Sequence, residues 1–432
     1  MKRTLSRRVT ASITLAIFAA SCATTKLPPI SAGSTTFTPE KDEQKLWVQA
    51  REEEAKLRDH ITIYDDPLLE DYLDDVVRRL DIHHVEASSP ISYRVTVVED
   101  PTLNAFAYPH GSLYVHTGLL ARMENEDQLA TVLGHEMTHV ENRHMVRHQR
   151  SMRNKQIGFS IAAVAGAVIA AGEQGDAVRE GHYGKAARIG VLSDILLGLG
   201  LTLAFMAAVN GYGRNLEREA DEGGFEKMET AGYDIREAPK VYAALEDDHG
   251  DAGKYETFFF GNHPRLSERI ESARSYATEH PEAVQASHFE DQRYFRRRMR
   301  PIIRTDARLN IELGRYNLAE DQLERVLEEV PADAQALDLM GLVKMKKADE
   351  AKDESKKQAL RDAARHFFET ALQQDPDIPE AHRELGLLNY RSSRFASACD
   401  EFRAYIKLAA DDEDVQTYRD YVLELDQDGY CH

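Results

Sequence analysis

Residues Asn125–Arg150, NEDQLATVLGHEMTHVENRHMVRHQR, decide how the centre of the chain folds. Apolar residues recur there with helical spacing and Asn125 is a suitable N-cap, so the segment is predicted to be a single helix. His135 and His139 then lie on one helical face, where two imidazoles can share a Zn²⁺ ion. Glu136 can reach a water on that metal. Because HExxH arises by chance in about one chain in a hundred of this length, the assignment needs support from elsewhere in the sequence.

A catalytic zinc site needs a third protein ligand and an open position. The segment Asn215–Asp221, NLEREAD, offers one, because Glu217 and Asp221 are four residues apart and share a helical face. Glu217 is the predicted ligand, and Asp221 is placed behind it to accept the distal N–H of a ligand histidine. Glu219 points elsewhere by the same geometry. An acidic cluster standing alone would be a solvated face, but its combination with HExxH favours the metal site.

His263, followed by Pro264, is a third candidate. A histidine before proline in a loop is usually structural. Peptide hydrolysis, however, needs a donor that stabilises the oxyanion of the tetrahedral intermediate. His263 is predicted to supply it, and Arg269 to orient His263 or bind the substrate backbone.

Two further histidines repeat the spacing of the first pair. His144 and His148 are also four residues apart, but Met145 stands where the glutamate is needed. A second metal site is therefore not predicted there.

The surrounding pattern is that of a mostly helical domain with a small sheet. Helical spacing and period-two alternation predict two helices, 40–58 and 67–80, and two strands, 91–97 and 112–116. Two apolar stretches, 157–171 and 189–209, come after the HExxH helix. The first is too short to span a membrane, and the second is marginal and carries Asp194. Buried helices are favoured for both over a membrane-touching or mobile lid.

Composition limits the classes of partner. The 432 residues suffice for two or three domains, and a hydrophobic share of 42% is typical of a globular protein. The formal net charge is −20, from 74 acidic and 54 basic residues. Nucleic acid and an anionic membrane surface would be repelled, so neither is expected as a partner.

The N-terminus has the features of an export signal. Basic residues are followed by the apolar stretch Val9–Ala20 and then by Ser21-Cys22. Small residues before a cysteine favour a lipoprotein signal, 1–21, with Cys22 lipidated as the membrane anchor. Cleavage after Ala23 is the alternative. Residues 22–40 then form a tether.

Export would permit a disulfide between the two remaining cysteines. These are Cys399 and Cys431, and the sequence leaves both a bond and two free thiols open.

The C-terminal part contains a repeat. Ala319, Ala364 and Ala398 are each followed four residues later by a large apolar side chain, at Leu323, Phe368 and Phe402. The last two alanines are separated by one period of a tetratricopeptide repeat, which is about 34 residues. The first two are further apart, which requires an insertion in the second repeat. The charged segment Lys344–Lys357 is predicted to hold this insertion, and 414–425 to form a capping helix.

These motifs together resemble the gluzincin metallopeptidases that include HtpX and the prenyl-protein endopeptidases, over about residues 45–275. The residues that carry the likeness are Asn104-Ala105-Phe106-Ala107, His135-Glu136-x-x-His139, Glu217-x-x-x-Asp221 and His263-Pro264 with Arg269. The resemblance implies one zinc held by His135, His139 and Glu217, with Glu136 as general base. It also implies that Asn104, Ala105, Phe106 and Ala107 border the substrate cleft. Family members often carry glycine where His110 stands, which leaves the role of His110 open.

An export signal together with trailing repeats is similar to the BepA-like members of this family. That likeness implies a zinc endopeptidase of the periplasm, anchored to the outer membrane, that degrades misfolded or stalled exported proteins. It also implies that the repeats contact the outer-membrane assembly machinery. A chaperone or adaptor with a latent protease site is the alternative. The expected fold is α+β, mostly α, with a metallopeptidase domain over 41–290 and a repeat solenoid over 300–427.

Overall fold

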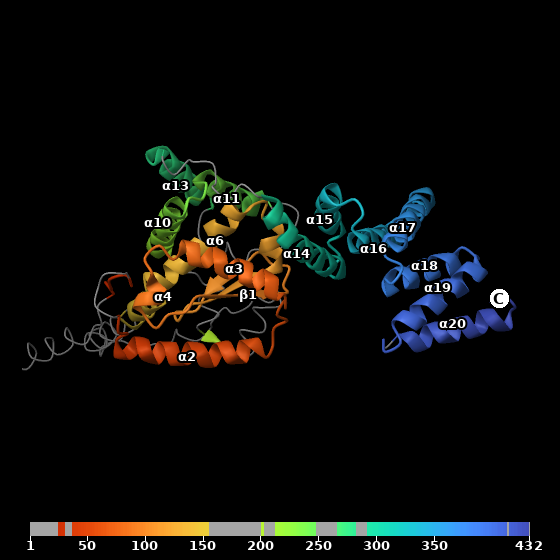
Figure 1. Cartoon of the computed structure of the whole chain (residues 1–432), viewed down its shortest axis with the longest axis horizontal. Coiled ribbons are helices and arrows are strands. Elements are labelled where there is room, and N and C mark those ends of the chain that lie inside the picture. The colour runs from red at the N-terminus through yellow and green to blue at the C-terminus, as the bar shows by residue number, and fades with distance from the viewer. Residues whose placement is uncertain are drawn as a thin grey trace, which may run out of the picture. The chain divides into compact units, whose positions relative to one another are not determined.

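The computed structural model describes residues 25–30, 37–154, 200–202, 212–247, 266–281, 292–412 and 414–431 (Figure 1). The signal, Cys22, His263, Pro264 and almost all of the two apolar stretches lie outside these residues. Within the described part, no helix is long and apolar enough to cross a membrane.

The chain divides into two compact units. The second unit contains the residues from Asp291 onward together with two short earlier segments, Glu99–Pro101 and Thr117–Arg122. The remaining residues form the first unit. The fold is α+β and mostly helical, as predicted, with a small sheet in the first unit and a helical repeat region in the second.

The first unit is built from helices around a three-stranded sheet. Its described elements are α2 (Lys41–Arg58), α3 (Pro67–Leu80), α4 (Val85–Ser88), β1 (Arg94–Val98), β2 (Ala105–Ala107), β3 (Ser112–His116), α6 (Glu126–Glu141), α10 (Arg214–Ala231), η2 (Ile235–Glu237), α11 (Ala238–Asp247) and α13 (Leu266–Glu279). The predicted helix 67–80 and strand 112–116 match α3 and β3. The other predicted strand is shorter, because β1 begins only at Arg94.

The sheet has the order β1-β3-β2, with β1 parallel and β2 antiparallel to the central strand β3. In Figure 1, α2 lies on one side of this sheet, and α3 and α6 lie on the other. On the α2 side, Phe106 pairs with Tyr114 and their rings stack at 5.0 Å. The Tyr114 hydroxyl donates to Glu54 of α2 at 2.8 Å. The alternation of side chains along β2 and β3 thus gives one face to α2 and the other to α6.

The prediction of one helix across Asn125–Arg150 is wrong. Helix α6 ends at Glu141, and a second helix begins at His144 after a turn in which Arg143 has φ 57°. A left-handed residue interrupts the helical hydrogen bonds and redirects the chain. The side chain of Arg143 stabilises this turn, because its guanidinium donates twice to the buried carboxylate of Glu43 in α2.

The second unit is a series of paired antiparallel helices. They are α14 (Gln292–Glu312), α15 (Tyr316–Glu329), α16 (Ala334–Glu350), α17 (Glu354–Gln374), α18 (Pro379–Arg391), α19 (Phe395–Leu408) and the final α20 (Val415–Gln427). The short earlier helix α5 (Thr117–Arg122) also belongs to this unit and packs against α14. A Cβ at Gly341 would lie 2.6 Å from the ring of Phe368, and one at Gly386 would lie 2.5 Å from the ring of Phe402. Small residues on one helix therefore receive aromatic rings from the next, as tetratricopeptide repeats require.

This unit settles the cysteine pairing, which the sequence left open, and shows how the predicted insertion is accommodated. Cys399 and Cys431 form a disulfide with a Cα–Cα distance of 5.7 Å. The insertion lengthens one helical pair, since α16 and α17 have 17 and 21 residues, whereas α18 and α19 have 13 and 14. Ala319 and Ala364 are 45 residues apart, which is 11 more than the 34 between Ala364 and Ala398. The first helical pair is longer than the second by the same 11 residues.

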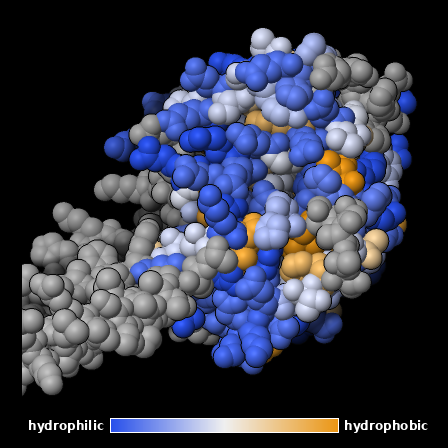
Figure 2. All heavy atoms as spheres, turned by 90° about the vertical axis from the view of Figure 1, so that its left-hand side faces the viewer, coloured by the Kyte–Doolittle hydropathy of each residue, from blue (hydrophilic) through white to orange (hydrophobic). Residues whose placement is uncertain are grey.

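Figure 2 shows one face of the molecule coloured by hydropathy. Hydrophilic residues cover most of the described surface on the face shown in Figure 2, and hydrophobic residues gather in a few small patches between them.

Candidate metal centre

Helix α6 presents two histidines to one buried point. Asn125 caps the helix by accepting a hydrogen bond from the Gln128 backbone N–H at 2.9 Å, as predicted. One turn separates His135 from His139, and their Nε2 atoms are 2.9 Å apart. Both side chains are almost fully buried. The imidazole nitrogens therefore converge in a place that bulk solvent barely reaches.

Helix α10 brings a carboxylate to the same point. Glu217 Oε2 lies 3.4 Å from Nε2 of His135 and 3.8 Å from Nε2 of His139. Its other oxygen accepts the backbone N–H of Tyr212 at 3.0 Å, which orients the carboxylate. Ligands about 2.0–2.1 Å from a tetrahedral zinc are about 3.3 Å from one another. The spacing of the two nitrogens and the oxygen fits that requirement.

Glycines let α6 and α10 approach closely enough for this. A Cβ on Gly224 would lie 3.1 Å from the His135 backbone nitrogen, and one on Gly134 would lie 3.3 Å from the Gly224 oxygen. A Cβ on Gly223 would lie only 2.5 Å from the Thr138 methyl group. The absence of side chains at these positions allows the two backbones to touch, and so sets the distance from Glu217 to the histidines.

Glu136 is a buried acidic residue next to these histidines. Its side chain is almost fully buried, and Oε1 has no hydrogen-bond partner among the described residues. Burial raises the pKa of its carboxyl to about 8. His135, Glu136 and His139 place potential ligand atoms within 4.8 Å of one another. A buried carboxylate oxygen beside three convergent donors fits a zinc site with a water held next to Glu136.

Behind the first histidine lies a buried network of three side chains. Asp221 Oδ1 is 2.9 Å from Nδ1 of His135 and also accepts from the Tyr242 hydroxyl at 3.1 Å. Arg269 donates to both Asp221 oxygens at 2.6–3.1 Å and lies 4.2 Å from the Tyr242 ring centroid. Burial acts to raise the pKa of Asp221, but Arg269 and His135 hold it below its usual value. Asp221 thus remains ionised and fixes the His135 tautomer in which Nε2 faces the metal point, the place where His135, His139 and Glu217 converge.

The position of Arg269 suggests a role different from the one expected. Its guanidinium donates to Asp221 and to the Tyr242 hydroxyl, and lies 3.1 Å from Nδ1 of His135, on the side of that ring away from Glu217. We assign it as a positioning residue that neutralises Asp221. Its predicted partner, His263, is outside the described residues.

Asp221→Asn is expected to weaken zinc binding by about 10- to 100-fold, because the amide cannot both orient His135 and neutralise the buried Arg269. Zinc affinity measured by competition with a chelator checks this. Tyr242→Phe is the matched control, since it removes one hydrogen bond to Asp221 and leaves the charge pair intact. Equal zinc affinity in Asp221→Asn and the native chain would contradict the role given to Asp221.

Sequence reasoning missed a second network, behind His139. Its Nδ1 lies 2.8 Å from Nδ1 of His144, whose Nε2 is 3.5 Å from Glu219, and Glu219 is bound by Arg147. Burial and the Arg147 guanidinium lower the pKa of His144 to about 4. His144 is therefore neutral and can accept the Nδ1–H of His139. Residues five apart do not share a face of a continuous helix, so only the turn after α6 makes this contact possible.

The Tyr212 ring is a further missed neighbour, at 4.4 Å from the His139 ring centroid. The only signal in the sequence for a role of Tyr212 at this site is its position five residues before Glu217.

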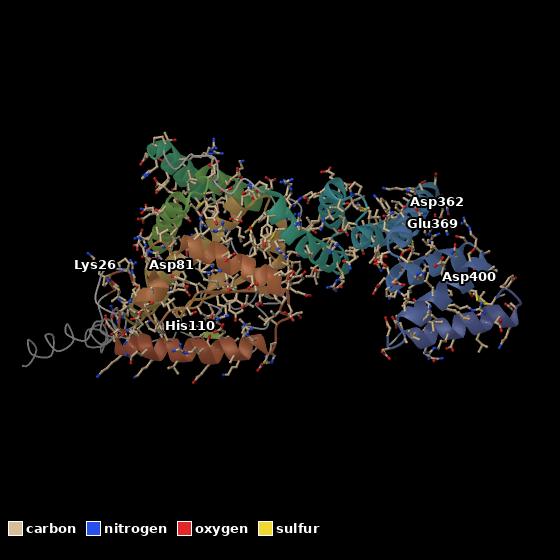
Figure 3. The ribbon with its side chains drawn as sticks, viewed as in Figure 1. Lys26, Asp81, His110, Asp362, Glu369 and Asp400 are labelled. Atoms are coloured by element: carbon tan, nitrogen blue, oxygen red, sulfur yellow. A yellow bond between two sulfur atoms is a disulfide. The ribbon has the colours of Figure 1, made fainter. Side chains whose placement is uncertain are left out.

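The structure separates His110 from the metal point. Its Nε2 contacts Glu54 of α2 at 2.8 Å, and Figure 3 shows it beside that helix. The predicted substrate segment 104–107 includes β2, which forms one edge of the described sheet and packs against α6. Such an edge strand could pair with an extended peptide.

Comparison with known proteins agrees with this geometry. Residues 67–277 match Peptidase family M48, and residues 349–413 match a tetratricopeptide repeat. Residues 67–277, most of which belong to the first unit, are thus similar to a peptidase family M48 domain. The predicted combination of such a domain with trailing tetratricopeptide repeats is confirmed.

Several curated proteins are similar over this domain. The putative beta-barrel assembly-enhancing protease of Vibrio cholerae is 28% identical over 234 residues, which cover 54% of this chain and 44% of that protein. Its Escherichia coli counterpart is 26% identical over 244 residues, with the same coverage. The mitochondrial metalloendopeptidase OMA1 of Schizosaccharomyces pombe is 31% identical over 208 residues, covering 48% and 53%. The chain therefore matches about half the length of these relatives.

Proposed function

We propose that this protein is a zinc-dependent endopeptidase of the bacterial cell envelope. The observation that carries the proposal is the convergence of His135, His139 and Glu217 beside the buried Oε1 of Glu136, which has no partner in the described part of the chain. The three convergent groups would hold one zinc ion. The similarity of its domain to a peptidase family supports the choice of reaction, since the same donor set on another fold could serve other hydrolyses.

Zinc, when bound, polarises the scissile carbonyl and lowers the pKa of the attacking water. Glu136 then performs the proton transfers. In its ionised form the carboxylate accepts a proton as the water oxygen bonds to the carbonyl carbon, and the pKa of about 8 makes it a stronger base for this step. It returns that proton to the amine nitrogen as the C–N bond breaks. Asp221 and His144 hold the imidazoles of His135 and His139 in place through their far nitrogens. His263 is proposed to donate a hydrogen bond to the oxyanion.

The proposed substrates are polypeptides in an extended state. The edge strand β2 packs against the helix that carries the two histidines, so a peptide added beside Asn104, Ala105, Phe106 and Ala107 would run along the metal site. The names of the similar bacterial proteases suggest a link to β-barrel assembly. We therefore propose misfolded or stalled outer-membrane proteins as substrates. The assembly machinery is proposed to be a partner of the repeats.

The proposed location is the periplasm, with the acyl chains on Cys22 as an anchor to the outer membrane. The support is the sequence from Met1 to Cys22, which has the order of a lipoprotein signal. The alternative function is that of an adaptor, which would act through the repeats and leave the metal site latent.

Incubation of the purified full-length chain with an unfolded outer-membrane β-barrel protein tests the proposed activity. Cleavage, followed by electrophoresis and mass spectrometry, is expected with zinc, to stop on addition of 1,10-phenanthroline and to resume when zinc is restored. Cleavage that is indifferent to the chelator would contradict a zinc peptidase. Stable binding of the unfolded protein by the zinc-loaded chain, without cleavage, would favour the adaptor.

A further inference from the structure

The insertion in the second repeat builds a pocket that the peptidase function does not use. The lengthened α16 and α17 extend the connected end of their hairpin, around Ala351–Asp353, beside the start of α15. The cavity between them has a volume of about 480 Å³. This lies within the range of about 300–1,000 Å³ that is usual for ligand sites. The polar residues lining it include Tyr316, Asn317, Glu320, Lys344, Lys347 and Lys356.

The pocket is locally basic in an acidic protein. Segment Lys344–Lys357 contains six lysines and four acidic residues, whereas the chain as a whole has a net charge of −20. Three of these lysines line the cavity, against the two carboxylates of Glu320 and Glu350. The N-terminus of α15 also lies at the cavity, which Tyr316 and Asn317 of its first turn line. The positive end of this 14-residue helix adds to the attraction for an anion.

Glu320 shows how the pocket holds a carboxylate. Its two oxygens are bound separately by Lys344 and Lys347, and all three side chains are mostly buried. Each ammonium group has three N–H donors and uses one of them in its hydrogen bond to Glu320. Both lysines line the cavity, so we expect the donors that remain to be available to a second carboxylate inside it. Lys356 supplies a third ammonium from α17.

We propose that this pocket binds an acidic segment of a polypeptide, with its carboxylates on Lys344, Lys347 and Lys356. The ammonium groups come from two helices and border a cavity much larger than a single phosphate. A ligand with several carboxylates spaced along a chain satisfies them better than a compact anion. The binding is electrostatic, so it weakens as salt concentration rises.

Fluorescence anisotropy of the full-length chain with a fluorescein-labelled tetrapeptide of alternating aspartate and glutamate tests the proposal. Lys344→Gln/Lys347→Gln is expected to weaken binding by about tenfold or more, because two charged hydrogen bonds are lost. Lys346→Gln/Lys352→Gln is the matched control. It removes the same charge from exposed positions in the same segment that do not line the pocket, and is expected to change the affinity less than about twofold.

Glu320→Gln is expected to change the affinity for the peptide in the opposite direction. Removal of the internal carboxylate frees donors on both lysines, so the peptide is expected to bind about twofold to fivefold more tightly. A purely structural role of these residues does not predict a gain. Lys356→Gln, at an exposed position, is expected to weaken binding even if the double variant fails to fold. Thermal unfolding and circular dichroism establish that each variant is folded.

Equal losses of affinity for the acidic peptide in Lys344→Gln/Lys347→Gln and in Lys346→Gln/Lys352→Gln would overturn the proposal. So would unchanged binding in Lys356→Gln, or equal affinity for an uncharged asparagine and glutamine peptide. Inorganic phosphate that competes as well as the unlabelled acidic peptide at equal concentration would overturn the assignment to a polypeptide.

Discussion

Glu136→Gln is expected to lower the rate of peptide hydrolysis by about 10²- to 10⁴-fold while zinc stays bound. The amide has the size of the carboxylate but cannot accept the proton of the attacking water. Glu136 Oε1 has no hydrogen-bond partner among the described residues, so the change breaks no bond formed by that atom. Zinc content, measured by atomic absorption, and cleavage of an unfolded β-barrel protein are the two readouts.

Glu217→Gln is the matched comparison, because it distinguishes a residue that binds zinc from one that acts as the base. Glu217 lies within 3.8 Å of both histidine Nε2 atoms, so its replacement is expected to lower zinc content and activity together. Zinc-free Glu136→Gln protein, or a Glu136→Gln chain with full activity, would show that Glu136 is not the general base.

Gly223→Ala is expected to destabilise the first unit by about 1–3 kcal/mol, as overpacked cores do. It should also weaken zinc binding by about tenfold or more, as loss of the groups that position a metal ligand does. The new methyl group would lie 2.5 Å from the methyl of the buried Thr138, and α10 would have to move away from α6. Glu217 lies on α10 and would move with it. Thermal unfolding and zinc affinity measure the two effects.

A second substitution tests the cause. Thr138→Ser removes the methyl group that meets the new Cβ and keeps the hydroxyl that donates to the Gly134 carbonyl at 2.7 Å. The double variant Gly223→Ala/Thr138→Ser is therefore expected to recover much of the lost stability and zinc affinity. Alanine is otherwise the better helix former by about 1 kcal/mol, so a Gly223→Ala chain that is more stable than the native one would contradict the close contact.

Much of the metal centre could be predicted because its spacing is local. Residues four apart share a helical face whatever surrounds the helix, and this rule pairs His135 with His139 and Glu217 with Asp221. The same reasoning did not reach His144, because the helix was expected to continue through it. The turn at Arg143 depends on an ion pair with Glu43, which is 100 residues away in the sequence.

The repeats were predictable for a similar reason. Small residues and their large partners recur at the spacing of a tetratricopeptide repeat, and the packing of Gly386 against Phe402 confirms the register. The position of the insertion also followed from the spacing. Its consequence did not, since a pocket at Lys344 and Lys347 appears only when the longer hairpin is placed beside α15.

Local sequence was enough to predict the HExxH helix, the second acidic helix and the repeat region, since each rests on periodicity within a short stretch of chain. Packing between distant elements was needed to show that Cys399 pairs with Cys431, that His144 contacts His139 and that Arg269 binds Asp221. It also decided the distance from Glu217 to the histidines. These contacts join residues from different elements, and their distances depend on how closely two backbones can approach. At the metal centre, Gly134, Gly223 and Gly224 set that limit.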